Sequence, residues 1–308
     1  MTVSRVVRDV QSVAPETVTR VRAAIKKLGY QPDPALSALA AYRYGEGGKN
    51  HGGVLAFLDC DGTEYSDLVF QGVQSEAQHL GYKLEYIRLD RGFQSQQKVS
   101  RHLFNCGIRG LLIGPTQTQW EFSGWDWTQF APVSLCALQH KPSMPAVVMD
   151  YFHSALTACH LLQKQGCKRI GCIVPRRMED RTGHRWLGGY HVGLGDKAKP
   201  CINVSEDASG LKEWTLKEKL DGVLTAHTDL WSILGPLGIR MAYLNVFCPD
   251  PEIPHLAFDP AWIGIEGVGM VHQLLLRHEW GLSQTPKMLV MQGRWVVGSG
   301  STTRPVEF

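Results

Sequence analysis

The sequence of 308 residues has no apolar run long enough to cross a bilayer, which takes about 18–20 residues. Its N-terminus, Met1–Asp9, has no long apolar core and soon turns polar, unlike a secretory signal. The eight cysteines include no Cys-x-x-Cys pair, which indicates free thiols in a reducing compartment rather than a disulfide framework or a zinc site. We therefore expect a cytoplasmic protein with no metal site and no membrane partner.

The common signatures of enzymes and cofactor-binding proteins are also missing. No Gly-x-Gly-x-x-Gly follows a strand, and there is no P-loop and no His-Glu-x-x-His. Asp59 and Asp61 are paired carboxylates at a predicted strand end, but nothing nearby supplies a partner base or a metal set. Strand-end acids of this kind more often bind a ligand or cap a helix, so catalysis is the minor alternative. We expect no enzymatic activity and no cofactor.

The net charge of +3 is unevenly distributed along the chain. Residues 1–49 carry eight basic and four acidic side chains, a balance of +4, whereas the remaining 24 basic and 25 acidic residues give −1. A basic head on a neutral body indicates contact with a polyanion. The alternative on charge alone is an ordinary solvated helix face.

The first 50 residues have a helical pattern. Pro15 suits the first position of a helix over 14–29, Gly29 suits its end, and apolar residues recur at helical spacing between them. Asp33 can cap a second, shorter helix, and a glycine-rich linker follows at 45–50.

From Gly53 onward, short apolar runs alternate with helical segments. The run Val54–Leu58 is typical of a strand buried on both faces of a parallel sheet. Further strands are expected at 83–89, 110–113, 132–138, 147–150, 170–174, 222–225, 241–247 and 288–291, with helices at 67–80, 95–105, 153–165, 185–194, 229–234 and 261–278. Two such series predict an α/β fold with two doubly wound parallel-sheet subdomains and a cleft between them.

Several segments match, in order, the motifs of one protein family. At the head these are Thr2–Val6, Val13–Thr17, Leu28–Pro32 and Asp33–Leu39. In the body they include Gly110–Ile113, Val148–Asp150, Gly166–Gly171, Arg185–Tyr190 and Gly293–Trp295. On these motifs the sequence resembles the LacI/GalR-type bacterial transcriptional regulators over nearly its whole length.

The resemblance implies a small all-α DNA-binding head joined to a core similar to periplasmic sugar-binding proteins. It implies a partial helix-turn-helix head at 1–30, a hinge helix and linker at 31–50, an N-terminal core subdomain at 51–149 plus 260–286, and a C-terminal one at 150–259 plus 287–308. It also implies a homodimer that binds a double-stranded DNA operator, probing base edges and phosphates through Thr2, Ser4 and Arg5. Leu36 and Leu39 belong to the hinge helix, which would enter the minor groove, and Leu39 would act there as the apolar wedge. The alternative is that both leucines pack on the core or on each other.

The family motif is entered partway through the recognition helix, so we expect the first helix and the turn of the head to be missing from this sequence. A head without that helix is expected to fold poorly and to bind specific DNA weakly. Two functions follow from this. The first is a ligand-responsive regulator, most simply a repressor. The alternative is a protein that binds a small molecule, such as a sugar, and has lost specific DNA binding.

The effector is expected in the cleft. Arg185 matches the family arginine that binds sugar hydroxyls or a ligand carboxylate. Ala137 and Asn245, however, stand where the family often has aspartates, which argues against an ordinary neutral sugar. The predicted ligand-binding residues are Asp59, Asp61, Tyr65, Asp150, Arg185, Trp186, Asn245 and Phe247. A tryptophan-rich loop at 120–127 is expected to be a pocket lid or a dimer contact.

Overall fold

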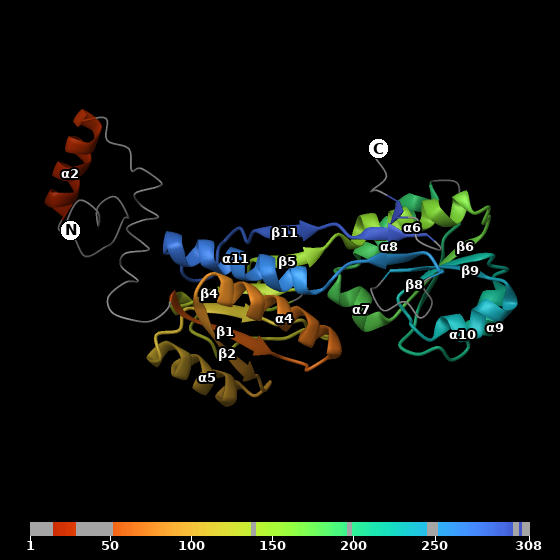
Figure 1. Ribbon diagram of the computed structural model, residues 1–308, viewed down its shortest axis with the longest axis horizontal. Coiled ribbons are helices and arrows are strands. Elements are labelled where there is room, and N and C mark those ends of the chain that lie inside the picture. Colours follow the sequence, from red (N-terminus) through yellow and green to blue (C-terminus); the bar gives the residue numbers. More distant parts are fainter. Residues whose placement is uncertain are drawn as a thin grey trace. The chain divides into compact units, whose positions relative to one another are not determined.

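A computed structural model describes residues 15–28, 52–136, 140–195, 199–244, 252–297 and 302–303 (Figure 1). The chain divides into two compact units, residues 1–50 and residues 51–308. In the first unit, helix α2 spans Pro15–Leu28, which confirms the helix expected at 14–29. The predicted DNA-binding residues Thr2, Ser4, Arg5, Leu36 and Leu39 lie outside the described residues.

Within the second unit, the first subdomain is built on a sheet in the order β11-β5-β4-β3-β1-β2, with every neighbouring pair parallel. Its strands are β1 (Gly52–Asp59), β2 (Tyr82–Arg88), β3 (Gly110–Ile113), β4 (Ala131–Leu135), β5 (Ala146–Met149) and β11 (Met288–Met291). Helices α4 (Glu64–His79), α5 (Phe93–Asn105) and α11 (Ala261–Arg277) complete it. The continuous apolar strands suit a sheet covered on both faces.

The two faces of this sheet bury separate sets of side chains. Leu55 and Phe57 of β1 pack in the cluster that contains residues of α4 and α11, whereas Ala56 and Leu58 pack in the cluster that contains Leu103 of α5. This is the period-two alternation of a strand. Helices α4 and α11 approach closely: a Cβ atom on Gly264 would lie only 2.2 Å from the carbonyl oxygen of Val69.

The second subdomain is built on a sheet in the order β13-β12-β10-β9-β8-β6-β7. Its strands are β6 (Ile170–Val174), β7 (Cys201–Val204), β8 (Gly222–Thr225), β9 (Arg240–Tyr243), β10 (His255–Ala257), β12 (Arg294–Val296) and β13 (Thr302–Thr303). The pairs from β7 to β10 are parallel, and β12 and β13 add antiparallel partners. The helices are α6 (Tyr151–Lys164), α7 (Arg176–Arg181), α8 (Arg185–Leu194), α9 (Leu211–Lys217) and α10 (Leu230–Leu234).

Two sequence expectations differ from the structure. Strand β11 pairs in parallel with β5 in the first sheet, so residues 288–291 do not belong to the second subdomain as expected from 287 onward. The tryptophans expected to form a pocket lid or a dimer contact are part of the core: Trp120, Trp125 and Trp127 are 1, 7 and 8% exposed and pack in the cluster of α5. Contacts between residues far apart in the sequence decide both locations: strand pairing places β11, and side-chain packing places the tryptophans.

Candidate functional site

A cavity of about 190 Å³ lies between the two subdomains, at the carboxyl ends of strands from both sheets. In doubly wound folds this edge is the usual place for a ligand. The lining residues come from the start of α4, the ends of β5 and β9, the loop after β3, and helices α6, α7 and α8: Thr63, Glu64, Tyr65, Gln117, Met149, Tyr151, Arg177, Met178, Arg181, Trp186 and Leu244.

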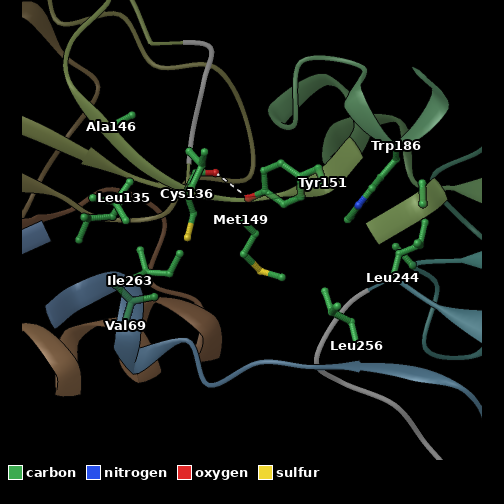
Figure 2. Packing of buried hydrophobic residues seen from close by; sticks show 14 of the residues in the cluster. Val69, Leu135, Cys136, Ala146, Met149, Tyr151, Trp186, Leu244, Leu256 and Ile263 are labelled. Carbon is green, nitrogen blue, oxygen red and sulfur yellow. Dashed lines mark hydrogen bonds between the residues drawn. The ribbon is translucent and has the colours of Figure 1, made fainter. Parts of the chain in front are cut away.

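The inner wall of the cavity is apolar and aromatic. Met149, Tyr151, Trp186 and Leu244 are buried, and Figure 2 shows them facing the same region from both subdomains. The Tyr151 hydroxyl donates a hydrogen bond to the carbonyl oxygen of Cys136 at 3.4 Å, and the Tyr65 hydroxyl lies 3.5 Å from the Cys136 sulfur. Both tyrosine hydroxyls are thus already engaged by the protein.

Two hydrogen-bond donors in the lining have no acceptor in the part of the protein that the structure describes. Nε1 of Trp186 and Nε of Arg181 are buried, and neither has a hydrogen-bond partner among the described residues. A buried donor without a partner costs about 1–3 kcal/mol, so these two groups are suited to a ligand acceptor.

The rim of the cavity carries the remaining charges. Arg177 is exposed, and its guanidinium lies 3.7 Å from a carboxylate oxygen of Glu206. Glu64 is exposed in the first turn of α4. The rim charges are therefore solvated or paired, unlike the buried Arg181 nitrogen.

Helix α8 places Trp186 in the cavity. Its first turn is held by Glu179, whose carboxylate accepts a hydrogen bond from the Leu187 amide at 3.1 Å. Burial raises the pKa of Glu179, against the lowering effect of that hydrogen bond. Glycines on α8 allow close packing on α6, because a Cβ atom on Gly189 would lie 2.1 Å from the carbonyl oxygen of Phe152.

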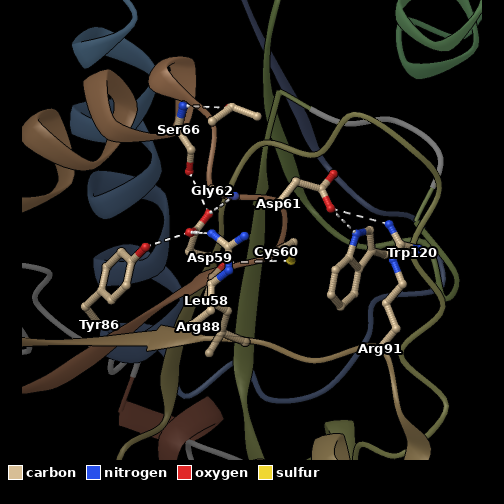
Figure 3. A network of polar contacts seen from close by, with 11 residues as sticks. Leu58, Asp59, Cys60, Asp61, Gly62, Ser66, Tyr86, Arg88, Arg91 and Trp120 are labelled. Atoms are coloured by element: carbon tan, nitrogen blue, oxygen red, sulfur yellow. Dashed lines mark hydrogen bonds and ion pairs between the residues drawn. The ribbon is translucent and has the colours of Figure 1, made fainter.

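Asp59, predicted to bind ligand, is instead bound by the protein itself (Figure 3). Its buried carboxylate accepts hydrogen bonds from Tyr86 at 2.6 Å, from Ser66 at 3.0 Å and from the Gly62 amide at 3.1 Å, and it pairs with Arg88. These donors outweigh the effect of burial and lower the pKa of Asp59. Asp59 does not line the cavity.

Asp61 and Asp150 also have structural partners rather than places in the cavity lining. Asp61 accepts a hydrogen bond from Trp120 Nε1 at 3.1 Å (Figure 3). It accepts another from the Gln117 amide at 2.6 Å. Asp150 caps α6 by accepting from the His153 amide at 3.0 Å. Both carboxylates hold the loops at the strand ends.

Of the eight residues predicted to bind ligand, Tyr65 and Trp186 line the cavity. Arg185 begins α8 but is not in the lining, and its side chain forms no ion pair with another described residue. Asn245 and Phe247 lie outside the described residues, next to the lining residue Leu244.

Sequence reasoning missed α7 and its arginines. The available signal was a pair of basic residues four positions apart, Arg177 and Arg181, directly after the predicted strand Ile170–Val174. Four residues is the spacing of one helical face. The six-residue helix is too short to show a repeated apolar stripe, so the local sequence predicts no helix at these residues.

Other kinds of site find no support in the described ranges. No group of three or more His, Cys, Asp or Glu side chains there is placed to hold a metal ion. The described helices include none that is long and apolar enough to span a membrane. The seven cysteines in the described part of the chain are free thiols.

Two parallel-dominated sheets with interleaved helices, and a cavity between their carboxyl ends, define the periplasmic-binding-protein-like fold. Comparison with known proteins agrees. Residues 1–33 match the family profile "Bacterial regulatory proteins, lacI family". The Lac repressor bound to ONPG superposes with a TM-score of 0.61 at 17% identity, over 96% of this chain and 94% of that one.

Curated relatives point the same way. The sucrose operon repressor of Streptococcus mutans is 27% identical over 267 residues, which is 84% of this chain and 78% of that protein. The transcriptional repressor PurR of Pectobacterium carotovorum is 28% identical over 204 residues, 61% of this chain and 54% of that protein. Residues 1–33 are thus similar to the lacI family of bacterial regulatory proteins, and the core has the fold of solved LacI-type regulators.

Proposed function

We propose that the protein is a ligand-responsive, DNA-binding transcriptional regulator, most simply a repressor, whose small-molecule effector occupies the cavity between the two subdomains. The observation that carries the effector site is a pair of buried donors in one cavity, Trp186 Nε1 and Arg181 Nε, that have no acceptor among the described residues. The head that matches the family profile supports the DNA-binding role. Relatives named as a sucrose operon repressor and as the transcriptional repressor PurR support the regulatory role.

The proposed coupling follows from the location of the cavity. Its lining joins Tyr65 and Met149 of the first subdomain to Arg181, Trp186 and Leu244 of the second. A ligand that contacts both subdomains stabilises the arrangement in which they fit it best. If two arrangements differ in DNA affinity, effector and DNA change each other's binding by the same factor.

At the DNA, the proposal uses two copies of the chain on a double-stranded operator. Thr2, Ser4 and Arg5 would contact base edges and phosphates in the major groove, and Leu36 and Leu39 would enter the minor groove. The protein would work in the cytoplasm, without enzymatic activity. A homodimer fits this use, because paired heads read two half-sites.

The test begins with selection of an operator from random duplexes by the full chain, followed by fluorescence anisotropy with and without candidate effectors. We expect one duplex to bind at least tenfold tighter than a scrambled duplex, and an effector to change that affinity. Trp186→Phe should keep the DNA affinity and lose the response, because it removes a donor from the cavity alone. Equal affinity for selected and scrambled duplexes, with effector binding intact, would instead indicate a small-molecule-binding protein without specific DNA binding.

A further inference from the structure

The polar groups that line the inner part of the cavity offer hydrogen-bond donors but few acceptors, which bears on the chemistry of the effector. We propose that the effector is a compact organic anion, a carboxylate on a largely apolar body, rather than a neutral sugar. This proposal rests on the proposed function. The argument uses the charge inside the cavity, the shortage of acceptors, and the apolar walls.

The charge inside the cavity is positive. Arg181 lies on α7 with its Nε atom buried, and no hydrogen bond or ion pair of its side chain is found among the described residues. Its charge acts on the inner wall, where it opposes the rise in pKa that burial causes at Cys136, which reaches about 11. A guanidinium without a carboxylate partner offers a planar set of donors that fits a carboxylate.

A second donor opens into the same cavity. Trp186 is 2% exposed, and its indole N–H is a donor only, so a ligand must supply the acceptor. Figure 2 shows the indole extending from α8 toward Tyr151 and Met149. Helix α4 also begins at the cavity with Thr63 and Glu64, and the positive end of a helix favours an anion.

Side-chain acceptors are scarce among the lining residues. Among the described lining residues, the acceptors Glu64 and Gln117 are exposed at the rim, and the Thr63 hydroxyl already accepts from the Ser66 amide at 3.2 Å. A neutral sugar brings many hydroxyl donors, and each buried donor without an acceptor costs about 1–3 kcal/mol. A carboxylate brings acceptors only and satisfies the two free donors.

The remaining lining favours an apolar body. Met149, Met178 and Leu244 provide aliphatic walls, and Tyr151 and Trp186 provide aromatic ones. The cavity volume of about 190 Å³ suits a small molecule rather than an oligosaccharide. An anion with an aliphatic or aromatic body uses both kinds of surface.

The experiment compares matched pairs of probes by isothermal titration calorimetry on the full chain: phenylacetate with phenylacetamide, hexanoate with hexanamide, and D-glucuronate with D-glucose. We expect at least one acid to bind at least tenfold tighter than its neutral partner. Arg181→Met should weaken that acid about 10- to 100-fold, as expected for loss of a charged hydrogen bond. Arg181→Lys should restore part of the preference for the acid. Arg176→Met is the matched control, because Arg176 is exposed on the same helix and is not in the lining.

The outcomes separate this inference from the proposed function. Equal binding of acid and neutral partner, binding of D-glucose alone, or an acid affinity unchanged in Arg181→Met overturns the anion assignment while leaving the cavity as the effector site. Absence of binding by every acid also overturns it. The proposed function fails separately, when the chain shows no preference for any selected duplex.

Discussion

At the residue scale, His140 is a buried base with no counter-charge in contact. It is 6% exposed, neither ring nitrogen has a hydrogen-bond partner in the described part of the chain, and its ring packs edge-on against Phe122 at 5.4 Å. Burial lowers the pKa of His140 to about 4, and the nearby Asp61 opposes this only in part. The folded state therefore resists protonation that the unfolded state accepts near pH 6.5.

The expected consequence is a loss of stability in acid. Stability from neutral His140 is complete above pH 6.5 and falls as the pH drops toward 4, by about 3 kcal/mol in total. His140→Leu should flatten the free energy of unfolding over that range, measured by urea denaturation at several pH values. His79→Gln, at an exposed position on α4, should keep the wild-type slope. A slope unchanged in His140→Leu would mean that another group is responsible.

Asp59 provides a test of structural against ligand-binding roles. Asp59→Ala leaves the Ser66 hydroxyl and the Gly62 amide without their acceptor, so we expect it to cost about 2–4 kcal/mol of stability. Effector affinity should change less than twofold, because Asp59 is outside the cavity lining. Asp67→Asn, exposed in the first turn of α4, should cost under about 0.5 kcal/mol. A large loss of effector affinity in a stable Asp59→Ala protein would return Asp59 to the binding site.

At the element scale, two adjacent glycines of α8 differ in what surrounds them. A Cβ atom on Gly189 would lie 2.1 Å from the Phe152 carbonyl oxygen, whereas one on Gly188 would meet only the Phe152 ring, at 3.5 Å. Gly189→Ala must therefore push α8 away from α6. Gly188→Ala makes an ordinary contact and gains helix propensity.

We expect Gly189→Ala to lose about 1–3 kcal/mol in the free energy of unfolding and Gly188→Ala to gain up to about 1 kcal/mol. Effector affinity should fall in Gly189→Ala alone, because α8 carries Trp186. Urea denaturation and calorimetry measure the two effects. Equal stability of both variants would show that α8 can move away from α6 at little cost in free energy.

At the scale of the whole molecule, the proposed DNA contact should depend strongly on salt. Arg20 and Lys26 are exposed on α2, and cations of this kind release counterions from phosphates on binding. The double variant Arg20→Gln/Lys26→Gln should reduce the slope of log affinity against log salt by about 2 if both contact phosphates. Anisotropy titrations from 50 to about 200 mM salt measure it. A slope that stays the same would place the phosphate contacts elsewhere on the chain.

Local sequence was sufficient for much of the fold. The bounds of β3, β6, β8 and β11 and of helix α8 agree with the prediction, because continuous apolar runs and a regular helical pattern are properties of neighbouring residues. The order of the two βα series also predicted two parallel sheets, since a parallel pair requires a crossover. The strands β7, β10 and β12 were missed because polar residues interrupt their apolar runs, at Asn203, His255 and Arg294, and the seven-residue helix α9 shows no repeated apolar stripe.

The sequence by itself therefore determined the two-subdomain α/β architecture and the edge of the sheets where a ligand would bind. Only the tertiary structure decided which strand-end side chains face that ligand. Asp59 does not line the cavity, because Tyr86 and Arg88 of β2 bind its carboxylate. These two residues lie 27 and 29 positions further along the chain. Trp186 and Arg181 each keep a buried donor without a partner because the described residues around them, drawn from both subdomains, place no acceptor within reach. Whether a polar group is satisfied depends on neighbours brought together by folding, and local sequence does not specify those neighbours.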